Sequence, residues 1–296
     1  MKTNSKRILS CGEVLWDLFP EGPRFGGAPA NFACHAAILG AEVTMLSAVG
    51  DDARGKEAIS ILQGFGIDTS LLQQVADAPT GSVGVSVDGS RKPSFEIHAG
   101  SAWDSIGWTT ALKERVAEVD ALYFGTLGQR GEVSRGTIRQ ALSLAKASNV
   151  LRVLDVNLRK PFYDAALIRE SIGQANVLKL SDDELGDVAS ACGFPIEAKP
   201  ETTLLALLTR FELHQVVMTR GAEGALLVSP EGVLEQPGIP TQVVDTVGAG
   251  DSFTAAFVLG LLQGEDYSTI LRRACELAST ICSQSGAVPH LAHSNL

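Results

Sequence analysis

Residues 245–253 read Asp245-Thr246-Val247-Gly248-Ala249-Gly250-Asp251-Ser252-Phe253, and a helical pattern of apolar residues follows them. The small residues from Gly248 to Gly250 let a ligand approach the backbone closely where the helix is expected to begin. Amides at a helix amino terminus point outward and carry partial positive charge, so this stretch predicts an anion-binding site. Asp251 falls in the first turn of the helix. Its carboxylate either complements the helix dipole, the more common arrangement, or acts on the bound anion.

Short apolar runs alternate with longer helical patterns along the rest of the chain. Runs that no polar residue interrupts are typical of parallel strands whose two faces are covered by helices. We therefore predict an α/β fold with a central, mainly parallel sheet. The predicted strands are 7–11, 42–48, 121–125, 151–156, 177–180, 215–219 and 225–229, and the predicted helices are 30–39, 53–63, 132–147, 182–191, 202–210, 251–263 and 267–283.

Two segments depart from this alternation. Residues 80–98 hold two alternating runs around the polar turn 88–92, which predicts an antiparallel hairpin. Residues 14–25 are expected to be extended, because two prolines and a glycine exclude a helix. The two segments form either a decoration at the edge of the sheet or a lid. A lid would cover a site at the carboxyl ends of the strands, where open α/β sheets bind ligands.

The composition excludes several classes of protein. The 296 residues include 24 basic and 34 acidic side chains, and the net charge of −10 argues against nucleic acid or an anionic membrane as the main partner. The five cysteines are scattered and the histidines form no metal-ligand pattern, so we expect reduced thiols in a soluble, cytoplasmic protein. Neither a signal peptide nor a membrane-spanning run is expected. We expect a single domain over residues 1–296.

A second segment, Gly50-Asp51-Asp52-Ala53-Arg54-Gly55-Lys56, fits the G-x-x-x-x-G-K pattern of a phosphate-binding P-loop. The next residue is Glu57, although a P-loop requires Ser or Thr there to hold magnesium. Asp51 and Asp52 would also face the phosphates with like charge. An ordinary helix start with Asp52 as N-cap explains the same residues better, and we favour that interpretation.

Two motifs that lie far apart in the chain resemble the signatures of one family, the ribokinase-like, PfkB-type carbohydrate kinases. The segment 245–253 is similar to the C-terminal signature, and Gly26-Gly27-Ala28-Pro29-Ala30-Asn31 is similar to the N-terminal one. Val49-Gly50-Asp51-Asp52 also matches the family pattern, which removes the P-loop interpretation. The resemblance covers essentially the whole chain. It implies a ribokinase-like three-layer sandwich with a small β-sheet lid formed by about residues 12–26 and 80–104.

The resemblance implies catalytic roles for the motif at 245–253. Asp251 would be the general base that accepts the proton of a sugar hydroxyl as that oxygen attacks the γ-phosphoryl group of ATP. Gly248, Ala249 and Gly250 would supply the amides that hold the transferring group. Phosphoryl transfer depends mainly on alignment and charge stabilisation, so a carboxylate beside such amides is chemically sufficient.

A second set of residues is implied to contact the substrate: Asp17, Gly27, Asn31, Asn157 and Arg159. A carboxylate and a carboxamide suit a polyol because they pair with neighbouring hydroxyls, although Asp17 taken alone would be read as a solvated loop acid. Asn157 and Arg159 belong to Asp155-Val156-Asn157-Leu158-Arg159, at the carboxyl end of a predicted strand. The guanidinium would neutralise phosphate charge or bind an acidic sugar; the alternative is a surface salt bridge.

The residues implied to bind ATP are Lys179, Glu184, Thr219, Arg220, Gly221, Gly224 and Gly250. Ser181-Asp182-Asp183-Glu184 stands where many family members carry Asn-x-x-Glu, so Ser replaces the Asn here. Glu184 would act through water on Mg2+ and the phosphates. The same spacing fits a capping box, with Ser181 as N-cap and Glu184 at N3, and both interpretations can hold together.

Potassium-activated members of the family place the ligands of a monovalent cation at the positions of Asp245, Val247, Ile281, Gln284 and Gly286. The resemblance therefore implies a K+ site formed by backbone carbonyls and one carboxylate. Lids in this family often pair through exposed strand edges, which gives the expectation of a homodimer.

We predict an ATP-dependent sugar kinase that uses Mg2+ and transfers the γ-phosphoryl group to a primary hydroxyl. Fructose, giving fructose 6-phosphate, is the first choice, because Gly12-Glu13 with Asp17, the motif at 26–31 and the motif at 155–159 resemble fructokinase-like members. Ketodeoxygluconate, ribose and nucleosides stay open as substrates. A non-catalytic sugar-binding regulator that kept the fold is the alternative from a different class.

Overall fold

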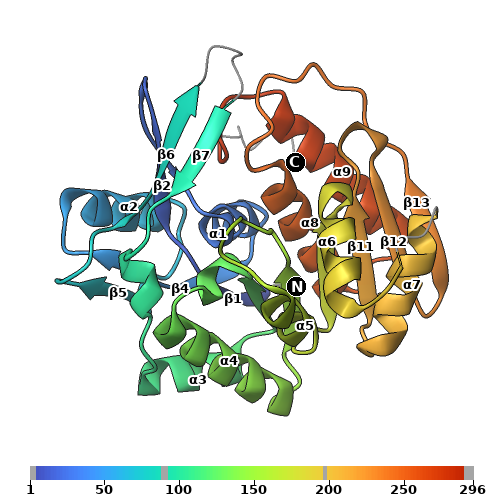
Figure 1. Ribbon diagram of the computed structural model, residues 1–296, viewed down its shortest axis with the longest axis horizontal. Coiled ribbons are helices and arrows are strands. Elements are labelled where there is room, and N and C mark those ends of the chain that lie inside the picture. Colours follow the sequence, from blue (N-terminus) through green and yellow to red (C-terminus); the bar gives the residue numbers. More distant parts are fainter. Residues whose placement is uncertain (1–4, 88–92, 196–198, 290–296) are drawn as a thin grey trace.

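Two β-sheets organise the protein, which the computed structural model describes over residues 5–87, 93–195 and 199–289 (Figure 1). The strands of the large sheet are β1 (Arg7–Cys11), β4 (Glu42–Gly50), β5 (Leu72–Val75), β8 (Ala121–Gly125), β9 (Leu151–Asp155), β10 (Val177–Ser181), β11 (Gln215–Thr219), β12 (Ala225–Ser229) and β13 (Gly232–Gln236). Those of the small sheet are β2 (Leu15–Phe19), β3 (Gly22–Gly26), β6 (Gly81–Val87) and β7 (Pro93–Ile97).

The large sheet has the order β13-β12-β11-β10-β9-β8-β1-β4-β5, and its strands from β11 to β5 run parallel. Only β12 and β13 turn back antiparallel, at one edge. In the middle, Ile8 of β1 is paired with Val43 of β4 and Ala121 of β8, and all three side chains are buried. The predicted mainly parallel sheet is therefore confirmed. The carboxyl ends of its central strands lie together at one edge, where such sheets bind ligands.

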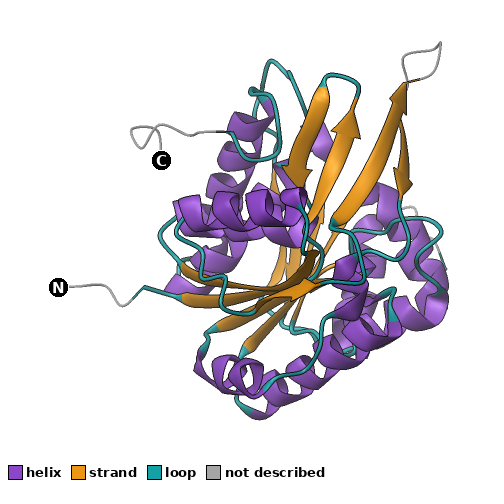
Figure 2. Cartoon of the chain, turned by 90° about the vertical axis from the view of Figure 1, so that its left-hand side faces the viewer, coloured by secondary structure: helices purple, strands orange, loops and turns teal. Residues whose placement is uncertain are grey.

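Helices cover both faces of the large sheet and bury one hydrophobic core on each side (Figure 2). One core packs α3 (Thr110–Glu118), α4 (Glu132–Ala147), α5 (Ala165–Ile172), α6 (Asp182–Cys192) and α7 (Pro200–Arg210) against the strands. The other packs α1 (Ala28–Ile38), α2 (Ala53–Gly64), α8 (Ala249–Gln263) and α9 (Tyr267–Cys282). This three-layer arrangement explains why the central strands are rich in apolar residues on both of their faces. In the described part of the chain, no helix combines the length and apolar character needed to cross a membrane.

The small sheet rises from the large one and has the order β3-β2-β6-β7 (Figure 2). β2 pairs antiparallel with β3 and parallel with β6, and β6 pairs antiparallel with β7. The predicted hairpin at 80–98 is therefore confirmed, whereas its predicted turn at 88–92 lies outside the described residues. The edge strands are β3 and β7, and the pairing of two copies through these edges stays a prediction.

Several elements escape the sequence pattern for physical reasons. α3 has only Leu112 and Val116 fully buried, so its apolar stripe is too thin to stand out from the surrounding charges. α5 has only eight residues. The edge strand β13 is partly exposed, with Val233 53% accessible, and β5 has four residues. Short or exposed elements bury little apolar surface and leave a correspondingly weak signal.

The segment that fits the P-loop pattern is an ordinary helix start. Asp52 is the N-cap of α2, and its Oδ1 atom accepts a hydrogen bond from the amide of Gly55 at 2.7 Å. The same carboxylate also accepts from the amide and the hydroxyl of Thr80, at 2.8 and 2.7 Å. With these donors in place, Asp52 serves to fix α2 against the start of β6, as the favoured interpretation of the sequence required.

One arginine ties the segment after the small sheet to the loop that follows β9. The guanidinium of Arg130 donates to both carboxylate oxygens of Asp104, at 2.7 and 2.8 Å, and to the carbonyl of His98 at 2.7 Å. It also lies between two rings, 3.8 Å from the ring centre of Trp103 and 4.7 Å from that of Phe162. The side chain is only 7% exposed, so these contacts take the place of water around the guanidinium group.

The Arg130→Ala substitution should lower the free energy of unfolding by about 3 kcal/mol, because it leaves the Asp104 carboxylate without its partner and opens a gap between two rings. Chemical denaturation followed by circular dichroism measures the loss. Arg139→Ala is the matched control, since Arg139 pairs with Glu170 at the surface and should lose less than about 1 kcal/mol. Equal losses in the two variants would contradict the structural role of Arg130.

Candidate active site

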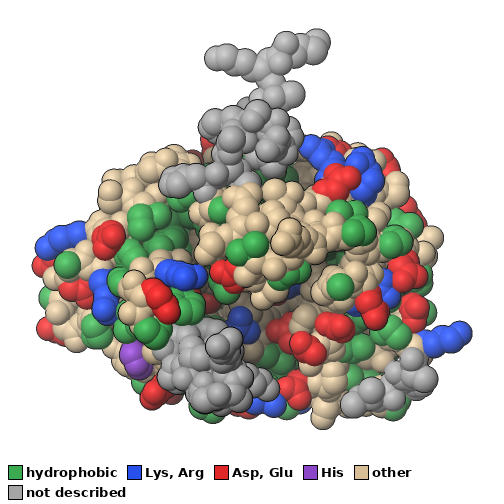
Figure 3. Space-filling model, turned by 90° about the horizontal axis from the view of Figure 1, so that it is seen from above, with side chains coloured by type: hydrophobic (Ala, Val, Ile, Leu, Met, Phe, Trp, Pro, Cys, Tyr) green, Lys and Arg blue, Asp and Glu red, His purple; other side chains and the backbone are tan. Residues whose placement is uncertain are grey.

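A cavity of about 510 Å3 lies between the small sheet and the carboxyl ends of the parallel strands. The face seen in Figure 3 is hollowed near its middle, where acidic and basic side chains gather. Residues from both ends and the middle of the chain meet in this cavity. Those among the predicted site residues that line it are Asp17, Gly27, Asn31, Asn157, Arg159, Lys179, Val247, Gly248, Gly250 and Asp251.

The amino terminus of α8 forms one wall of this cavity. Gly248 is the N-cap in a left-handed conformation, with φ of 80°, and a Cβ atom there would lie 2.3 Å from the carbonyl oxygen of Ala287. Only glycine satisfies both conditions. The amides of Ala249 and Ser252 donate to backbone carbonyls, whereas those of Gly250 and Asp251 find no acceptor within the described residues. These two free amides at a helix amino terminus suit an anion.

Asp251 lies in the first turn of α8, beside those amides. Its Oδ2 atom accepts a hydrogen bond of 2.8 Å from the side-chain amide of Asn31 in α1. Removal from water raises the pKa of the Asp251 carboxyl, while the Asn31 hydrogen bond and the charges of Lys179 and Arg159 oppose that rise. A carboxylate whose proton affinity is increased in this way is suited to accept a proton from a hydroxyl group.

The opposite end of the cavity is acidic and lies next to the small sheet. Burial raises the pKa of Asp17 to about 6, against the attraction of Arg159 and Arg24. Gly27, with φ of 107°, begins α1 here, and a Cβ atom on it would lie 2.5 Å from the carbonyl oxygen of Glu13. The Oδ1 atom of Asn31 is buried and has no hydrogen-bond partner among the described residues. This end therefore offers unused acceptors to a polar ligand.

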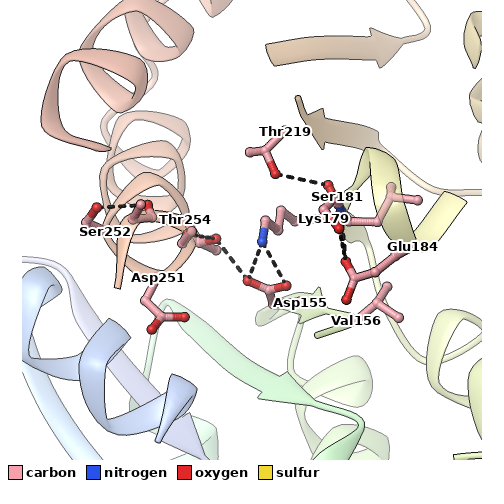
Figure 4. Close-up of polar contacts among 12 residues, drawn as sticks. Asp155, Val156, Lys179, Ser181, Glu184, Thr219, Asp251, Ser252 and Thr254 are labelled. Atoms are coloured by element: carbon pink, nitrogen blue, oxygen red, sulfur yellow. Dashed lines mark hydrogen bonds and ion pairs between the residues drawn. The ribbon is translucent and has the colours of Figure 1, made fainter. Parts of the chain in front are cut away.

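A buried ion pair lies under the amino terminus of α8 (Figure 4). The Nζ atom of Lys179, in β10, is 3.1 Å from both carboxylate oxygens of Asp155, the last residue of β9. The hydroxyl of Thr254 in α8 lies 3.2 Å from Oδ2 of the same carboxylate. A Cβ atom on Gly250 would be only 3.1 Å from the Lys179 Nζ atom, so the ammonium group borders the anion-binding amides.

Glu184 is held by hydrogen bonds at the start of α6 (Figure 4). Its Oε2 atom accepts from the amide and the hydroxyl of Ser181, at 2.8 and 2.9 Å, and Oε1 accepts from the amide of Leu158 at 2.7 Å. The predicted capping box is therefore confirmed. The carboxylate lines neither this cavity nor the second one described next, so contact with a metal ion would have to pass through water.

A second cavity, of about 600 Å3, lies on the other side of Gly250 and shares Gly250 and Thr246 with the first. Four residues predicted to approach a nucleotide or its phosphates line it: Thr219, Gly221, Gly224 and Ala249. Its remaining wall is largely apolar and includes Ile239, Pro240 and Phe253. The amides at the start of α8 thus lie at the junction of a polar cavity and an apolar one.

Other predicted site residues lie outside both cavities. Arg220 forms an ion pair of 2.7 Å with Glu235 instead of lining the second cavity. Asp245 accepts hydrogen bonds of 3.1 Å from the amides of Val247 and Gly286, which draws the two chain segments of the predicted K+ site together. Ile281 and Gln284 stand at the end of α9, where the Ile281 carbonyl accepts from the Gln284 amide at 3.0 Å.

The structure adds residues to which the sequence assigned no site role. Glu13 lies two residues after the end of β1, and burial raises the pKa of its carboxyl to about 7. Asp155 ends β9 and carries the ion pair described above. Both are charged residues at or just beyond the carboxyl ends of buried strands, and this position in the sequence could have identified them as candidate site residues. Ile239 and Pro240 of the second cavity lie in a loop, and no sequence pattern marks them as site residues.

Comparison with known proteins agrees with this geometry. Residues 22–293 match the profile of the pfkB family carbohydrate kinases. The chain is 28% identical to probable fructokinase-5 of Arabidopsis thaliana, over 97% of this chain and 95% of that one, and 28% identical to aminoimidazole riboside kinase of Salmonella typhimurium, over 88% and 82%.

A solved structure has the same fold. The sugar kinase PH1459 of Pyrococcus horikoshii, crystallised in complex with ATP, superposes with a TM-score of 0.80 at 27% identity, covering 95% of this chain and 94% of that one. The ribokinase-like arrangement of a large, mainly parallel sheet and a small sheet is therefore confirmed. By the match of its sequence over residues 22–293, the chain belongs to the pfkB family of carbohydrate kinases.

Proposed function

We propose that this carbohydrate kinase transfers the γ-phosphoryl group of ATP to a primary hydroxyl of a small sugar, with fructose giving fructose 6-phosphate. The observation that carries the proposal is the position of Asp251 beside the free amides at the start of α8, where the two cavities meet. A hydroxyl in the polar cavity and a phosphate group on the amides would both lie within reach of this carboxylate.

The polar cavity has the chemistry of a sugar site. Asp17 and Asn31 offer acceptors that pair with neighbouring hydroxyls, and Glu13 completes an acidic floor. The volume of about 510 Å3 exceeds that of a single hexose, which leaves room for a terminal phosphate. The chain is equally similar, at 28% identity, to probable fructokinase-5 and to aminoimidazole riboside kinase, so overall identity does not favour one sugar over another. The preference for fructose therefore rests on the residues of the small sheet.

The apolar cavity suits the base of a nucleotide. Ile239, Pro240 and Phe253 provide surface for a planar ring, and Gly221 and Gly224 allow close approach of the backbone. PH1459 was crystallised with ATP, and this chain shares its fold. ATP lying across the junction would direct its phosphates at Gly250 and place the γ-phosphoryl group next to Asp251.

Magnesium fits this site only as an ion carried by the nucleotide. Among the described residues, no group of three or more acidic, histidine or cysteine side chains could hold a metal ion. Glu184 already accepts three hydrogen bonds, so we propose that it acts through a bound water molecule. When bound, Mg2+ would neutralise phosphate charge, as it does in other phosphoryl transfers.

In the proposed reaction, Asp251 accepts the hydroxyl proton while the sugar oxygen bonds to the γ-phosphorus and the bond to the leaving ADP oxygen breaks. The amides of Gly250 and Asp251, with the Lys179 ammonium, would stabilise charge on the transferring group. We assign the small sheet, within a single domain, the role of a lid that excludes water and so limits hydrolysis of ATP.

A potassium ion that binds beside Asp245 would compete with the guanidinium group of Arg24 for the Asp245 carboxylate. Two amides already hold the Asp245 carboxylate, and the Nη1 atom of Arg24 lies 3.7 Å from its Oδ2 atom. The carbonyl groups of Val247, Ile281, Gln284 and Gly286 would have to supply the remaining ligands. We keep K+ activation as a proposal, and the sugar assay described below includes it as one arm.

A second substrate class has one observation in its favour. Arg159 lines the polar cavity, and in the described chain its guanidinium forms no ion pair, although its Nη1 atom donates to the carbonyl of Leu158 at 3.0 Å. The alternative of a surface salt bridge is therefore not seen. A free guanidinium would also receive the carboxylate of a sugar acid such as 2-keto-3-deoxygluconate.

The identity of the sugar is tested by measuring ADP release with fructose, 2-keto-3-deoxygluconate, ribose and nucleosides as acceptors. We expect the highest kcat/KM for fructose, and a higher value in potassium than in sodium chloride. Preference for a nucleoside or a sugar acid would overturn the fructose assignment while leaving the kinase chemistry intact. Equal rates in both salts would overturn potassium activation. Absence of any phosphoryl transfer would favour the sugar-binding regulator.

The Asp251→Asn substitution should lower kcat about 1,000-fold, because the amide cannot accept the hydroxyl proton. Binding of the sugar and of ATP, measured by calorimetry, should change little, since Asn keeps the shape and the hydrogen bond from Asn31. Glu132→Gln is the matched control, because Glu132 stands in the first turn of α4, outside both cavities, and its loss should not affect kcat. Near-full activity of Asp251→Asn would disprove the role of general base.

Sugar binding should weaken below about pH 6, because the Asp17 carboxylate, whose pKa is about 6, becomes protonated and accepts hydroxyl hydrogens less well. Calorimetric dissociation constants between about pH 5 and 8 measure this, with the best acceptor of the sugar panel as ligand. Asp17→Asn should bind about tenfold more weakly at pH 8 and lose the part of the pH dependence near pH 6, whereas the part near pH 7 that Glu13 contributes should remain. An unchanged pH profile in that variant would show that another group controls binding.

A further inference from the structure

The ion pair between Asp155 and Lys179 is almost completely removed from water. The two side chains are 1% and 9% exposed, and burial raises the pKa of Asp155 to about 6 even though the charge of Lys179 lowers it. Exchanging such a pair for apolar residues is often neutral or stabilising, so stability alone gives little reason for two charges here. We therefore look for a functional role of this pair in the neighbouring active site.

Lys179 faces two groups that would attract its charge. Its Nζ atom lies against Gly250, where the transferring phosphoryl group is proposed to bind, and its charge lowers the pKa of Asp251. In an empty site, an ammonium group free to move would be drawn to the Asp251 carboxylate. A direct ion pair between them would block the proposed base and uncover the anion-binding amides.

We propose that Asp155 is a positioning residue that holds the Lys179 ammonium beside Gly250 and keeps it from pairing with Asp251. The inference rests on the proposed phosphoryl transfer and adds a role for a residue that does not touch the substrate. Asp155 ends a strand of the central sheet, so its backbone is held by pairing with both neighbouring strands. The ammonium lies 3.1 Å from both oxygens, so the two oxygens share it.

Thr254 links this carboxylate to the catalytic helix. Its hydroxyl lies 3.2 Å from Oδ2 of Asp155 and 2.8 Å from the carbonyl of Gly250, so its single hydrogen is shared between the two acceptors. Thr254 follows Asp251 by three residues, on the same side of α8. The three side chains seen together in Figure 4 thus connect β9, β10 and α8 below the anion-binding amides.

A double-mutant cycle tests the proposal with the best acceptor of the sugar panel, so a wrong sugar assignment does not affect the result. Asp155→Asn and Lys179→Met should each lower kcat about 100-fold. Because Asp155 acts through Lys179, the double variant should lose no more than the larger single loss. Independent losses would multiply to about 10,000-fold, and that result would overturn the proposal.

Asp104→Asn is the matched control for the cycle, because it removes the carboxylate of a second, largely buried ion pair, that with Arg130. Its effect on kcat should multiply with that of Lys179→Met. Coupling of equal size in this control would show that any weakened ion pair gives the same result, and would also overturn the proposal. Thr254→Val, a milder change, gives a second test if Asp155→Asn folds poorly: its smaller loss should vanish in the Lys179→Met background.

A crystal structure of Asp155→Asn without ligands provides a readout other than activity. We expect the Lys179 Nζ atom to leave Gly250 and to lie within hydrogen-bond distance of the Asp251 carboxylate. An ammonium group that stays beside Gly250 would show that Asp155 does not position it. If the wild-type enzyme transferred no phosphoryl group at all, the proposed function would fail, while this structural result would still decide where Asp155 holds Lys179.

Discussion

The proposed mechanism depends on one constraint: the Asp251 carboxylate must stay ionised although it is shielded from bulk water. Burial favours the protonated form of Asp251, and a protonated acid cannot serve as a base. Three contributions oppose protonation: the side-chain amide of Asn31, the nearby cations Lys179 and Arg159, and the positive end of α8. The glycine at position 248 is part of the same solution, because only a residue without a side chain lets α8 begin against Ala287.

The topology of the sheet brings these contributions together. β1, β8, β9 and β10 are parallel neighbours, so the residues that follow each of them emerge at one edge. α1 and α8 pack side by side on one face, which places Asn31 against Asp251 although the two are 220 residues apart. The opposite face of the sheet has a core of its own, and Leu158, the neighbour of Arg159, packs against it. The fold thus brings Asp251, Lys179 and Arg159 close together although they belong to segments far apart in the chain.

The sequence predicted the central strands and most helices, because elements buried on both faces or on one wide stripe leave a strong periodic signal. It also located Asp251, Gly248 and Gly250 from the chemistry of a helix start. It missed α3, α5 and β13, which bury too little to be distinguished from loops. Asp155 was quoted in a motif without a role, because its meaning comes from Lys179 and Thr254, which only the packing of β10 and α8 brings near. Contacts between side chains of distant segments produce no periodic pattern in the sequence, so sequence analysis does not detect them.

The acidic floor of the polar cavity links the folding equilibrium to the supply of ligand. Burial raises the pKa of Glu13 from 4.5 to about 7 and that of Asp17 from 3.8 to about 6, so the folded chain holds protons that the unfolded chain has already lost. Stability therefore falls as pH rises through these intervals, and at neutral pH the empty cavity subtracts from the free energy of unfolding. A ligand whose hydroxyls donate to the ionised carboxylates returns part of that energy. If the sugar binds in this cavity as proposed, the folded fraction of the enzyme rises with sugar concentration, and the protein is less stable when sugar is scarce.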